Sequence, residues 1–376
     1  MAGIYIHIPF CSKRCIYCGF YSTTAVRDTN RYIDAICKEL KMRTNYLKNN
    51  TIKTIYIGGG TPSLLNHQQL ERIFSTIRDN YNISQVEEVT IECNPNDLTT
   101  NYIAQLKKLP INRISMGVQS FEDSILNFLR RRHNAEQAIN AVQECQKAGF
   151  RNISIDLIYG IPGQSDHSFK NDIKRAVSLG VTHISSYHLS YEENTPLWKQ
   201  LQNGDIDVID EESSVNMYNI LCSTLSQHNY SHYEISNFAI DGFQSKHNSS
   251  YWNGTPYLGI GASAHSFNGS ARRWNPDNLE LYIDSIECGN PIYEEEMLSA
   301  TDLYNEAIML GLRKSEGIQL TDFRNRFGDS LYEKLMHNAQ PYIYTGSLIK
   351  EIDRIRISEH GLFISDNIIS SLFIVD

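Results

Sequence analysis

Residues 4–18 read IYIHIPFCSKRCIYC, and this stretch decides how the rest of the chain is interpreted. Ile4–Ile8 is a short β-branched run that predicts a strand, while Pro9 before the cysteines and Gly19 after them favour a loop over a helix. Cys11, Cys15 and Cys18 fall close together, whereas the other five cysteines are scattered singly. Scattered cysteines in a reducing compartment are usually small buried hydrophobes, but clustered ones are usually ligands.

The cysteine cluster offers three thiolates, and Phe20 stands where a further cysteine could have followed. Structural zinc sites and electron-transfer ferredoxin clusters normally close with four protein ligands. Three ligands instead leave one metal position open, as a 4Fe–4S cluster needs in order to chelate the amino and carboxylate groups of S-adenosylmethionine (SAM). Zinc with His7 as the fourth ligand is the alternative.

From Gly3 to about residue 190 the sequence alternates β-branched runs with amphipathic helical stretches, which predicts repeated βα units. Six strands are expected, at Ile4–Ile8, Thr54–Ile57, Val86–Glu92, Arg113–Val118, Asn152–Tyr159 and His183–Leu189. Asn66 with Gln69 predicts a capping box at the second helix, and Gly149 suits the end of the helix that precedes it.

Six such units suit either a parallel barrel or an open doubly wound sheet. Distinctive polar residues follow or end each strand, and a barrel converges all strand ends on one mouth, whereas an open sheet spreads them along a line. We therefore expect an α/β fold with a partial (βα)6 barrel.

Beyond residue 190 the alternation stops. We expect a strand at Tyr233–Phe238 and then an irregular aromatic segment over Lys246–Phe267. From Thr301 onward we expect three short helices and a β-hairpin formed by Ile355–Ser358 and Leu362–Ile364. This organisation predicts a core over residues 1–230 and a C-terminal α+β region over 231–376, whose winged-helix-like end is 301–376. Wings often bind DNA, but this tail is not basic, which favours a structural cap.

Composition limits the choice of partners. The 376 residues carry a formal net charge of −9, which disfavours electrostatic binding of long nucleic acids or anionic lipid. No stretch approaches the length of a membrane span, and no charged-then-apolar leader follows Met1, so we expect a cytoplasmic protein.

The cysteine motif and the following Gly58-Gly59-Gly60-Thr61-Pro62 together resemble the radical SAM superfamily, whose fold is a partial βα barrel. Only glycines let backbone carbonyls approach a bound amino group closely. Gly259-Ile260-Gly261 is similar to a dinucleotide fingerprint but lacks the surrounding βαβ unit, so it carries little weight.

Further motifs resemble the HemN/HemW family of oxygen-independent coproporphyrinogen III oxidase and its haem-chaperone relatives: IECNP at Ile91–Pro95, MGVQSF at Met116–Phe121, IDLIYGIPG at Ile155–Gly163 and YEISNF at Tyr233–Phe238. This resemblance implies SAM-contacting positions at Tyr5, Tyr17, Phe20, Gly59, Gly60, Thr61, Glu92, Gln119, Arg131 and Asp156.

Three features indicate the HemW branch. Phe20 replaces the extra cysteine of HemN, the cluster lies close to Met1, and His247-Asn248-Ser249-Ser250-Tyr251-Trp252 fits the HNxxYW pattern. Gly19 departs from the acidic residue common in this branch. An imidazole beside aromatic rings suits a porphyrin, so His247, Tyr251 and Trp252 are candidate haem contacts, with His188 and His265 as weaker ligand candidates.

The resemblance therefore implies a haem chaperone that holds haem as cargo, passes it to haem-requiring client proteins and draws on an electron donor. The alternative is the enzyme, in which a SAM-derived radical removes a β-hydrogen from a coproporphyrinogen propionate so that CO₂ leaves and a vinyl group remains. In that enzyme the protein would supply orientation and exclude water, while the cofactor carries the radical chemistry.

Overall fold

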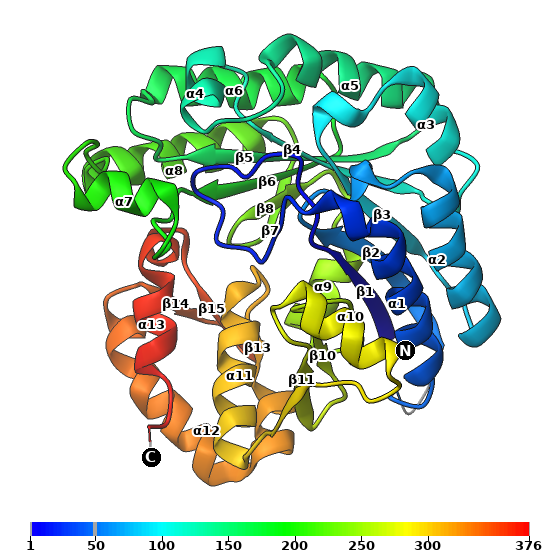
Figure 1. Ribbon diagram of the computed structural model, residues 1–376. Helices are drawn as coiled ribbons and strands as arrows, with labels where there is room; N and C mark the ends of the chain where they lie inside the picture. The colour runs from blue at the N-terminus through cyan, green and yellow to red at the C-terminus, as the bar shows by residue number, and fades with distance from the viewer. Residues whose placement is uncertain (1, 48–50, 376) are drawn as a thin grey trace.

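The computed structural model describes residues 2–47 and 51–375, and a twelve-stranded sheet forms its centre (Figure 1). The six predicted strands are confirmed, and they lie side by side, in chain order and parallel. They are β1 (Ala2–Ile8), β2 (Ile52–Gly59), β3 (Glu88–Cys93), β4 (Arg113–Gln119), β5 (Asn152–Tyr159) and β6 (His183–His188). Because the sheet ends at β12 on one side and β7 on the other, the barrel is partial, as expected.

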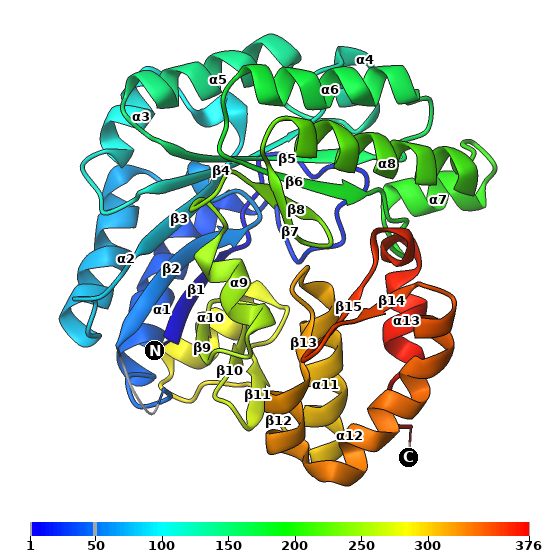
Figure 2. The ribbon, with the colours of Figure 1, turned by 180° about the vertical axis from the view of Figure 1, so that it is seen from behind.

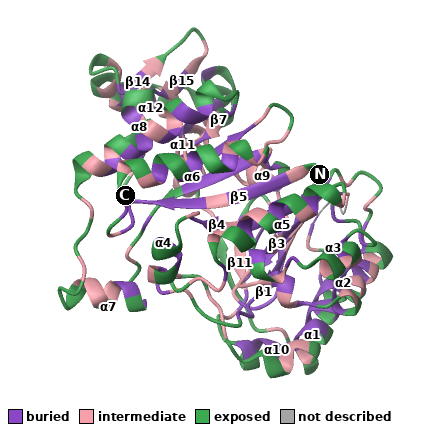
Figure 3. Cartoon of the chain, turned by 90° about the horizontal axis from the view of Figure 1, so that it is seen from above, coloured by how far each residue is buried: buried purple, intermediate pink, exposed green. Residues whose placement is uncertain are grey.

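Helices cover the convex face of the parallel strands (Figures 1 and 3). They are α1 (Thr29–Met42), α2 (His67–Asn80), α3 (Thr100–Leu106), α4 (Asp123–Phe128), α5 (Ala135–Lys147), α6 (Asp166–Ser178) and α8 (Glu211–Gln227). The predicted capping box of Asn66 and Gln69 begins α2, and Gly149 follows α5 with a φ of 85°. Local sequence thus sets the ends of these helices, while their apolar faces attach them to the sheet.

The sheet continues beyond the six parallel strands on both sides. On one side lies the hairpin of β7 (Ser231–Glu234) and β8 (Asn237–Ala239), so the prediction of one strand over Tyr233–Phe238 is wrong. The chain turns at Ile235–Ser236, where Glu234 pairs with Asn237. Strands this short show too few alternations for a sequence pattern to separate them.

On the other side the predicted irregular segment is also wrong, because residues 246–267 are ordered. They form α9 (Lys246–Trp252), β9 (Tyr257–Ile260) and β10 (His265–Phe267), followed by β11 (Ala271–Trp274), α10 (Leu279–Glu287) and β12 (Glu294–Met297). β9 pairs with β1 in parallel, and β10 to β12 follow in antiparallel order. Pairing of β9 with β1, and of each later strand with the one before it, supplies the order that the local sequence does not signal.

The C-terminal residues have a hydrophobic core of their own, running from Tyr304 to Leu372. It is built from α11 (Ala300–Arg313), α12 (Leu320–Tyr344), α13 (Ser365–Ser371) and a small sheet of β13 (Ile318–Gln319), β14 (Leu348–Lys350) and β15 (Arg354–Ile357). Helices and a hairpin are present as expected, but the hairpin is β14–β15, and Leu362–Ile364 lies in a 3₁₀ helix instead. The division at residue 230 stays a prediction.

Within residues 2–47 and 51–375, no helix has both the length and the apolar character needed to cross a membrane.

Candidate functional site

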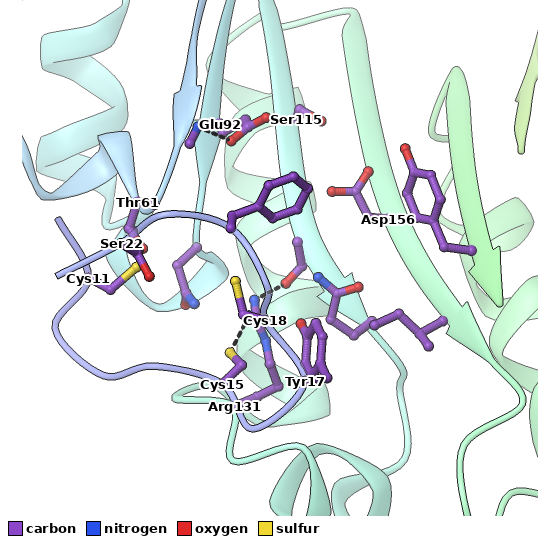
Figure 4. Close-up of a pocket in the computed structure, with 18 of the residues that line it drawn as sticks. Cys11, Cys15, Tyr17, Cys18, Ser22, Thr61, Glu92, Ser115, Arg131 and Asp156 are labelled. Atoms are coloured by element: carbon purple, nitrogen blue, oxygen red, sulfur yellow. Dashed lines mark hydrogen bonds between the residues drawn. The ribbon is translucent and has the colours of Figure 1, made fainter. Parts of the chain in front are cut away.

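A cavity of about 640 Å³ lies at the carboxyl ends of the parallel strands, beneath the cysteine loop, residues 9–23 (Figure 4). The structure brings nearly all of the predicted cluster and SAM residues to its wall. These are Cys11, Cys15, Tyr17, Cys18, Phe20, Gly59, Gly60, Thr61, Glu92, Gln119, Arg131 and Asp156. Tyr5 is not among the lining residues.

The cysteine loop is fixed at both of its ends. Thr23 N–H donates to Pro9 O at 2.7 Å, and Cys11 N–H donates to Thr23 O at 2.9 Å. In the middle of the loop, Ile16 is buried against Leu189 and Leu197. The loop therefore holds its cysteines over the cavity without a regular element of its own.

The glycine triplet lets this loop lie directly on the end of β2. A Cβ atom on Gly60 would come within 2.8 Å of the backbone of Pro9 and Phe10. Gly59 has a φ of 109°, and a Cβ atom there would lie 2.7 Å from the His7 ring. Both positions need glycine because any side chain would displace the cysteine loop or His7.

Two side chains donate to the sulfurs. Thr61 Oγ1 donates to Cys11 Sγ at 3.4 Å, and Arg131 Nη1 donates to Cys15 Sγ at 3.1 Å. Donors directed at sulfur stabilise the thiolate form and tune an iron–sulfur centre. The donor set thus fits a cluster held by three thiolates, which Cys18 completes at the cavity wall.

The zinc alternative does not fit His7. Its Nε2–H donates to Tyr21 O at 3.1 Å, so Nδ1 accepts from the Tyr5 hydroxyl at 3.0 Å. With both ring nitrogens paired, His7 has no lone pair for a metal in this conformation. Across the described part of the chain, no three His, Cys, Asp or Glu side chains converge as a site for a single metal ion. Tyr5 accordingly supports the cavity through His7 and does not line it.

Two carboxylates face the cavity, Glu92 from β3 and Asp156 from β5, the strands on either side of β4 (Figure 4). Glu92 accepts from the Tyr56 hydroxyl at 2.7 Å and from Gly59 N–H at 3.0 Å. Burial raises the pKa of Glu92 to about 7 and that of Asp156 to about 6. Such carboxylates can accept hydrogen bonds from hydroxyl or ammonium groups of a ligand, and an ammonium group would favour their ionised form.

The cavity wall also holds polar atoms that nothing in the described residues satisfies. Arg131 donates to Cys15 and to Gly117 O, but its Nε is buried without a partner. Ser22 Oγ is likewise buried without a hydrogen-bond partner. Buried polar groups are nearly always paired, so these two atoms indicate that a polar ligand belongs in the cavity.

The HNxxYW residues lie beside this cavity, on α9, which packs on the face of β2 that carries Thr54 and Tyr56. His247 is fully buried; its Nδ1 is 2.8 Å from Thr54 Oγ1, and its Nε2 is 2.8 Å from the Tyr251 hydroxyl. Its ring stacks on Tyr56 at 5.1 Å, and its backbone N–H donates to Glu88. We call these five residues the His247 cluster. Burial lowers the pKa of His247 to about 3, so its imidazole is neutral.

The neighbouring Trp252 faces the C-terminal helices. The Arg313 guanidinium of α11 lies 5.0 Å from the centre of its ring, within cation–π range. Asn248, by contrast, reaches the cavity wall. The three haem candidates of the motif therefore do not share one open surface.

Comparison with known proteins identifies the family. The Radical SAM superfamily model matches residues 5–176, and the HemN C-terminal domain model matches residues 298–364. The protein named Heme chaperone HemW from Lactococcus lactis subsp. lactis (strain IL1403) is 35% identical over 372 residues, which cover 99% of this chain and 97% of that protein. Heme chaperone HemW from Bacillus subtilis (strain 168) is 35% identical over 92% of this chain and 95% of its own length.

The chain belongs to the HemW family. Its fold is that of Escherichia coli coproporphyrinogen III oxidase (HemN), a radical SAM enzyme, with a TM-score of 0.86 and 22% identity over 99% of this chain and 90% of that one. A radical SAM domain implies a 4Fe–4S cluster and SAM.

Several cavity residues were missed by reasoning from sequence. Tyr56, Arg113, Ser115 and Ser185 line the wall deeper in the strands than the predicted set. The signal was present in β4, where Arg113, Ser115, Gly117 and Gln119 alternate with Ile114, Met116 and Val118. Alternation with a period of two places the polar members on the concave face of the sheet. Polar residues that precede the end of a strand, as these four missed residues do, are overlooked when only the strand ends are considered. Cys93, expected to be a packing residue, also borders the cavity.

Proposed function

We propose that the protein is a haem chaperone that carries a 4Fe–4S cluster on Cys11, Cys15 and Cys18, holds SAM in the adjoining cavity and delivers haem to client proteins. The convergence of three thiols, two buried carboxylates and the unpaired Arg131 Nε on one cavity supports the cluster and SAM sites. Similarity to a Heme chaperone HemW over 97% of that protein's length supports the haem role.

Each part of the cavity has a role that follows from its chemistry. When bound, a cluster with three cysteine ligands supplies one open iron for the amino and carboxylate groups of SAM. Gly59 and Gly60 let His7 and the cysteine loop lie against the end of β2, which places the cysteines beside the SAM cavity. Glu92 and Asp156 accept hydrogen bonds from SAM hydroxyl or ammonium groups, and Arg131 offsets the negative charge of the thiolates.

The remaining SAM contacts come from both sides of the cavity. Tyr17 and Phe20 approach from the cysteine loop, and Thr61 and Gln119 from the strand ends. Phe20 is 73% exposed, so a ligand that fills the cavity mouth would bury it. Tyr5 acts indirectly, by fixing His7 beneath Gly59.

We further propose an electron donor for the cluster and haem-requiring client proteins as partners. A reducing, cytoplasmic location is consistent with all eight cysteines being free. The haem contacts proposed from the motif are His247, Tyr251 and Trp252, although the burial of His247 requires that it contribute by position or after a local opening.

Titration of anaerobically purified protein with ferric haem tests the chaperone role. We expect a saturable Soret band at one haem per chain and transfer of that haem to an apo-haemoprotein. Absence of a saturable band would contradict the proposal. Reduced protein with SAM and coproporphyrinogen III should give no multiple-turnover vinyl product, and formation of that product would favour the enzyme instead.

A further inference from the structure

The structure distinguishes among the histidines that could ligate haem iron, an inference that rests on the proposed haem binding. A ligand histidine needs a ring nitrogen with a free lone pair and access for a large planar molecule. His247 has neither, since both nitrogens are paired and the side chain is fully buried.

Other histidines of the central sheet are paired in the same way. His183 bonds Ser154 and Tyr233 through its two nitrogens, at 2.7 and 2.8 Å. His188 lies 3.0 Å from Leu189 O and 3.0 Å from Ser214 Oγ. With His7 also paired, these rings serve to hold strands and helices together.

His265 differs from them. It is the first residue of β10 and is exposed, and neither of its ring nitrogens has a hydrogen-bond partner among residues 2–47 and 51–375. Its ring stacks on Trp274, the residue opposite it on β11, with centres 5.7 Å apart and planes 20° from parallel. The stack limits rotation of the imidazole while leaving the nitrogens at its edge free.

The strand register places His265 on the concave side of the sheet. Phe267, two residues further along β10, pairs with Tyr257 of β9, and residues two apart in a strand share a face. Gly259, two residues after Tyr257, pairs with Tyr5 of β1. His265 and Trp274 therefore lie on the face of the sheet that carries Tyr5, at the antiparallel extension between β1 and α11 (Figure 2).

The surroundings suit a flat aromatic ligand, and their charges are mixed, because Glu294 and Glu296 of β12 lie opposite Trp274 and Arg272 on the same face. Trp274 is half-buried beside the imidazole, and Tyr257 and Phe267 continue an aromatic row with centres 6.4 Å apart. Arg272 lies over Phe267 and also pairs with Glu306 of α11. Partial burial, assisted by Arg272, lowers the pKa of His265, which keeps the imidazole neutral and able to bind a metal.

We propose that His265 is the axial ligand of haem iron, with Trp274 holding the plane of its ring. His247 is then a positioning residue, which links α9 to β2 and supports Tyr56 beneath Glu92. His247 then affects haem binding only through the shape of this part of the sheet.

The test is a ferric haem titration of the full chain, comparing wild type with His265→Ala, His265→Cys and His228→Ala. His228 is an exposed histidine at the end of α8 and serves as the matched control. We expect His265→Ala to bind haem about 10–100-fold more weakly, the scale of losing a group at a metal site, and added imidazole to restore the wild-type Soret band. His265→Cys should show the spectrum of a thiolate-ligated haem.

The results that would refute the proposed function differ from those that would refute this inference alone. A wild-type protein that binds no haem would refute the proposed function and this inference together. Haem binding by wild type that His265→Ala leaves unchanged, or a His265→Cys spectrum without thiolate character, would refute the inference alone. A loss of the Soret band in His228→Ala equal to that in His265→Ala would also overturn it. Circular dichroism of each variant confirms that the fold is intact.

Discussion

The cavity and the His247 cluster lie side by side on the same face of β2, where Tyr56 belongs to both, yet their other polar groups differ in how they are paired. In the cavity, Arg131 Nε and Ser22 Oγ are buried without partners. In the His247 cluster, both imidazole nitrogens and both oxygens of Glu88 are hydrogen-bonded within the chain. Unpaired buried polar atoms that line a cavity indicate a place for a ligand, whereas the paired groups of the His247 cluster support the fold.

The largest effect is expected at the cysteines. Cys11→Ala, Cys15→Ala and Cys18→Ala should each abolish the cluster, because each removes one of three thiolate ligands. Iron analysis and the broad visible absorption of anaerobically purified protein measure this loss. Cys288→Ala, which changes an exposed cysteine far along the chain, should retain full iron content. Retention of iron by any of the three variants would remove that cysteine from the site.

His247→Ala tests the other side of the comparison. It should lower the free energy of unfolding by about 3 kcal/mol, because it leaves a cavity and strips Thr54 and Tyr251 of their partner. Urea denaturation measures the change. His228→Ala, at an exposed site, should change stability by no more than about 0.5 kcal/mol. Equal stability of the two variants would show that the His247 cluster is not a structural support.

Glu92 should make SAM binding depend on pH. Its pKa of about 7 means that lowering the pH protonates the carboxylate and removes a hydrogen-bond acceptor. Affinity for SAM should fall about tenfold between about pH 8 and pH 6, as expected for one such group. Isothermal titration with cluster-loaded protein measures it, and Glu92→Gln should bind weakly with a flat profile.

The same carboxylate has the opposite effect on stability. Its pKa is raised in the folded state, so the folded chain binds the proton more tightly than the unfolded chain. Stability without ligand is therefore lost as pH rises from the unfolded value, about 4.5, through about 7. Glu92→Gln should lessen that loss. A variant with the wild-type pH profile for SAM would exclude Glu92 from the binding site.

The smallest effect on stability is expected in the helices that cover the convex face of the sheet. Asn66→Ala removes the capping box of α2 and should cost about 1 kcal/mol of stability. Because α2 packs on the convex face, SAM affinity should not change. Thermal unfolding and SAM titration on one preparation give both numbers, and a large loss of SAM affinity would show that the two faces of the sheet are coupled.

Much of the fold could be predicted from local patterns in the sequence. The six parallel strands are long enough for their periodicity to show, and helix ends such as Asn66 and Gly149 carry their own signals. β9 and β10 could not be predicted in this way, since strands of three or four residues become ordered only by pairing, here of β9 with β1 and of β10 with β9. The terminal hairpin was misplaced for the same reason.

The candidate site could be predicted from the sequence wherever the type of residue and its place at a strand end were sufficient. Twelve of the predicted positions meet at one cavity, because consecutive parallel strands end on the same side of the sheet. What sequence could not show was whether a polar side chain is already satisfied. In the sequence His247 is the stronger ligand candidate and His265 a weaker one, and the hydrogen bonds and exposure that distinguish them are visible only in the structure.

The most direct test of the central claim, that the unpaired polar cavity holds SAM beside a cluster with an open iron, is electron paramagnetic resonance of the reduced protein with and without SAM. We predict about four irons per chain and a spectrum whose g values shift when SAM is added. A cluster spectrum that SAM leaves unchanged, or a colourless protein with one zinc per chain, would contradict the account.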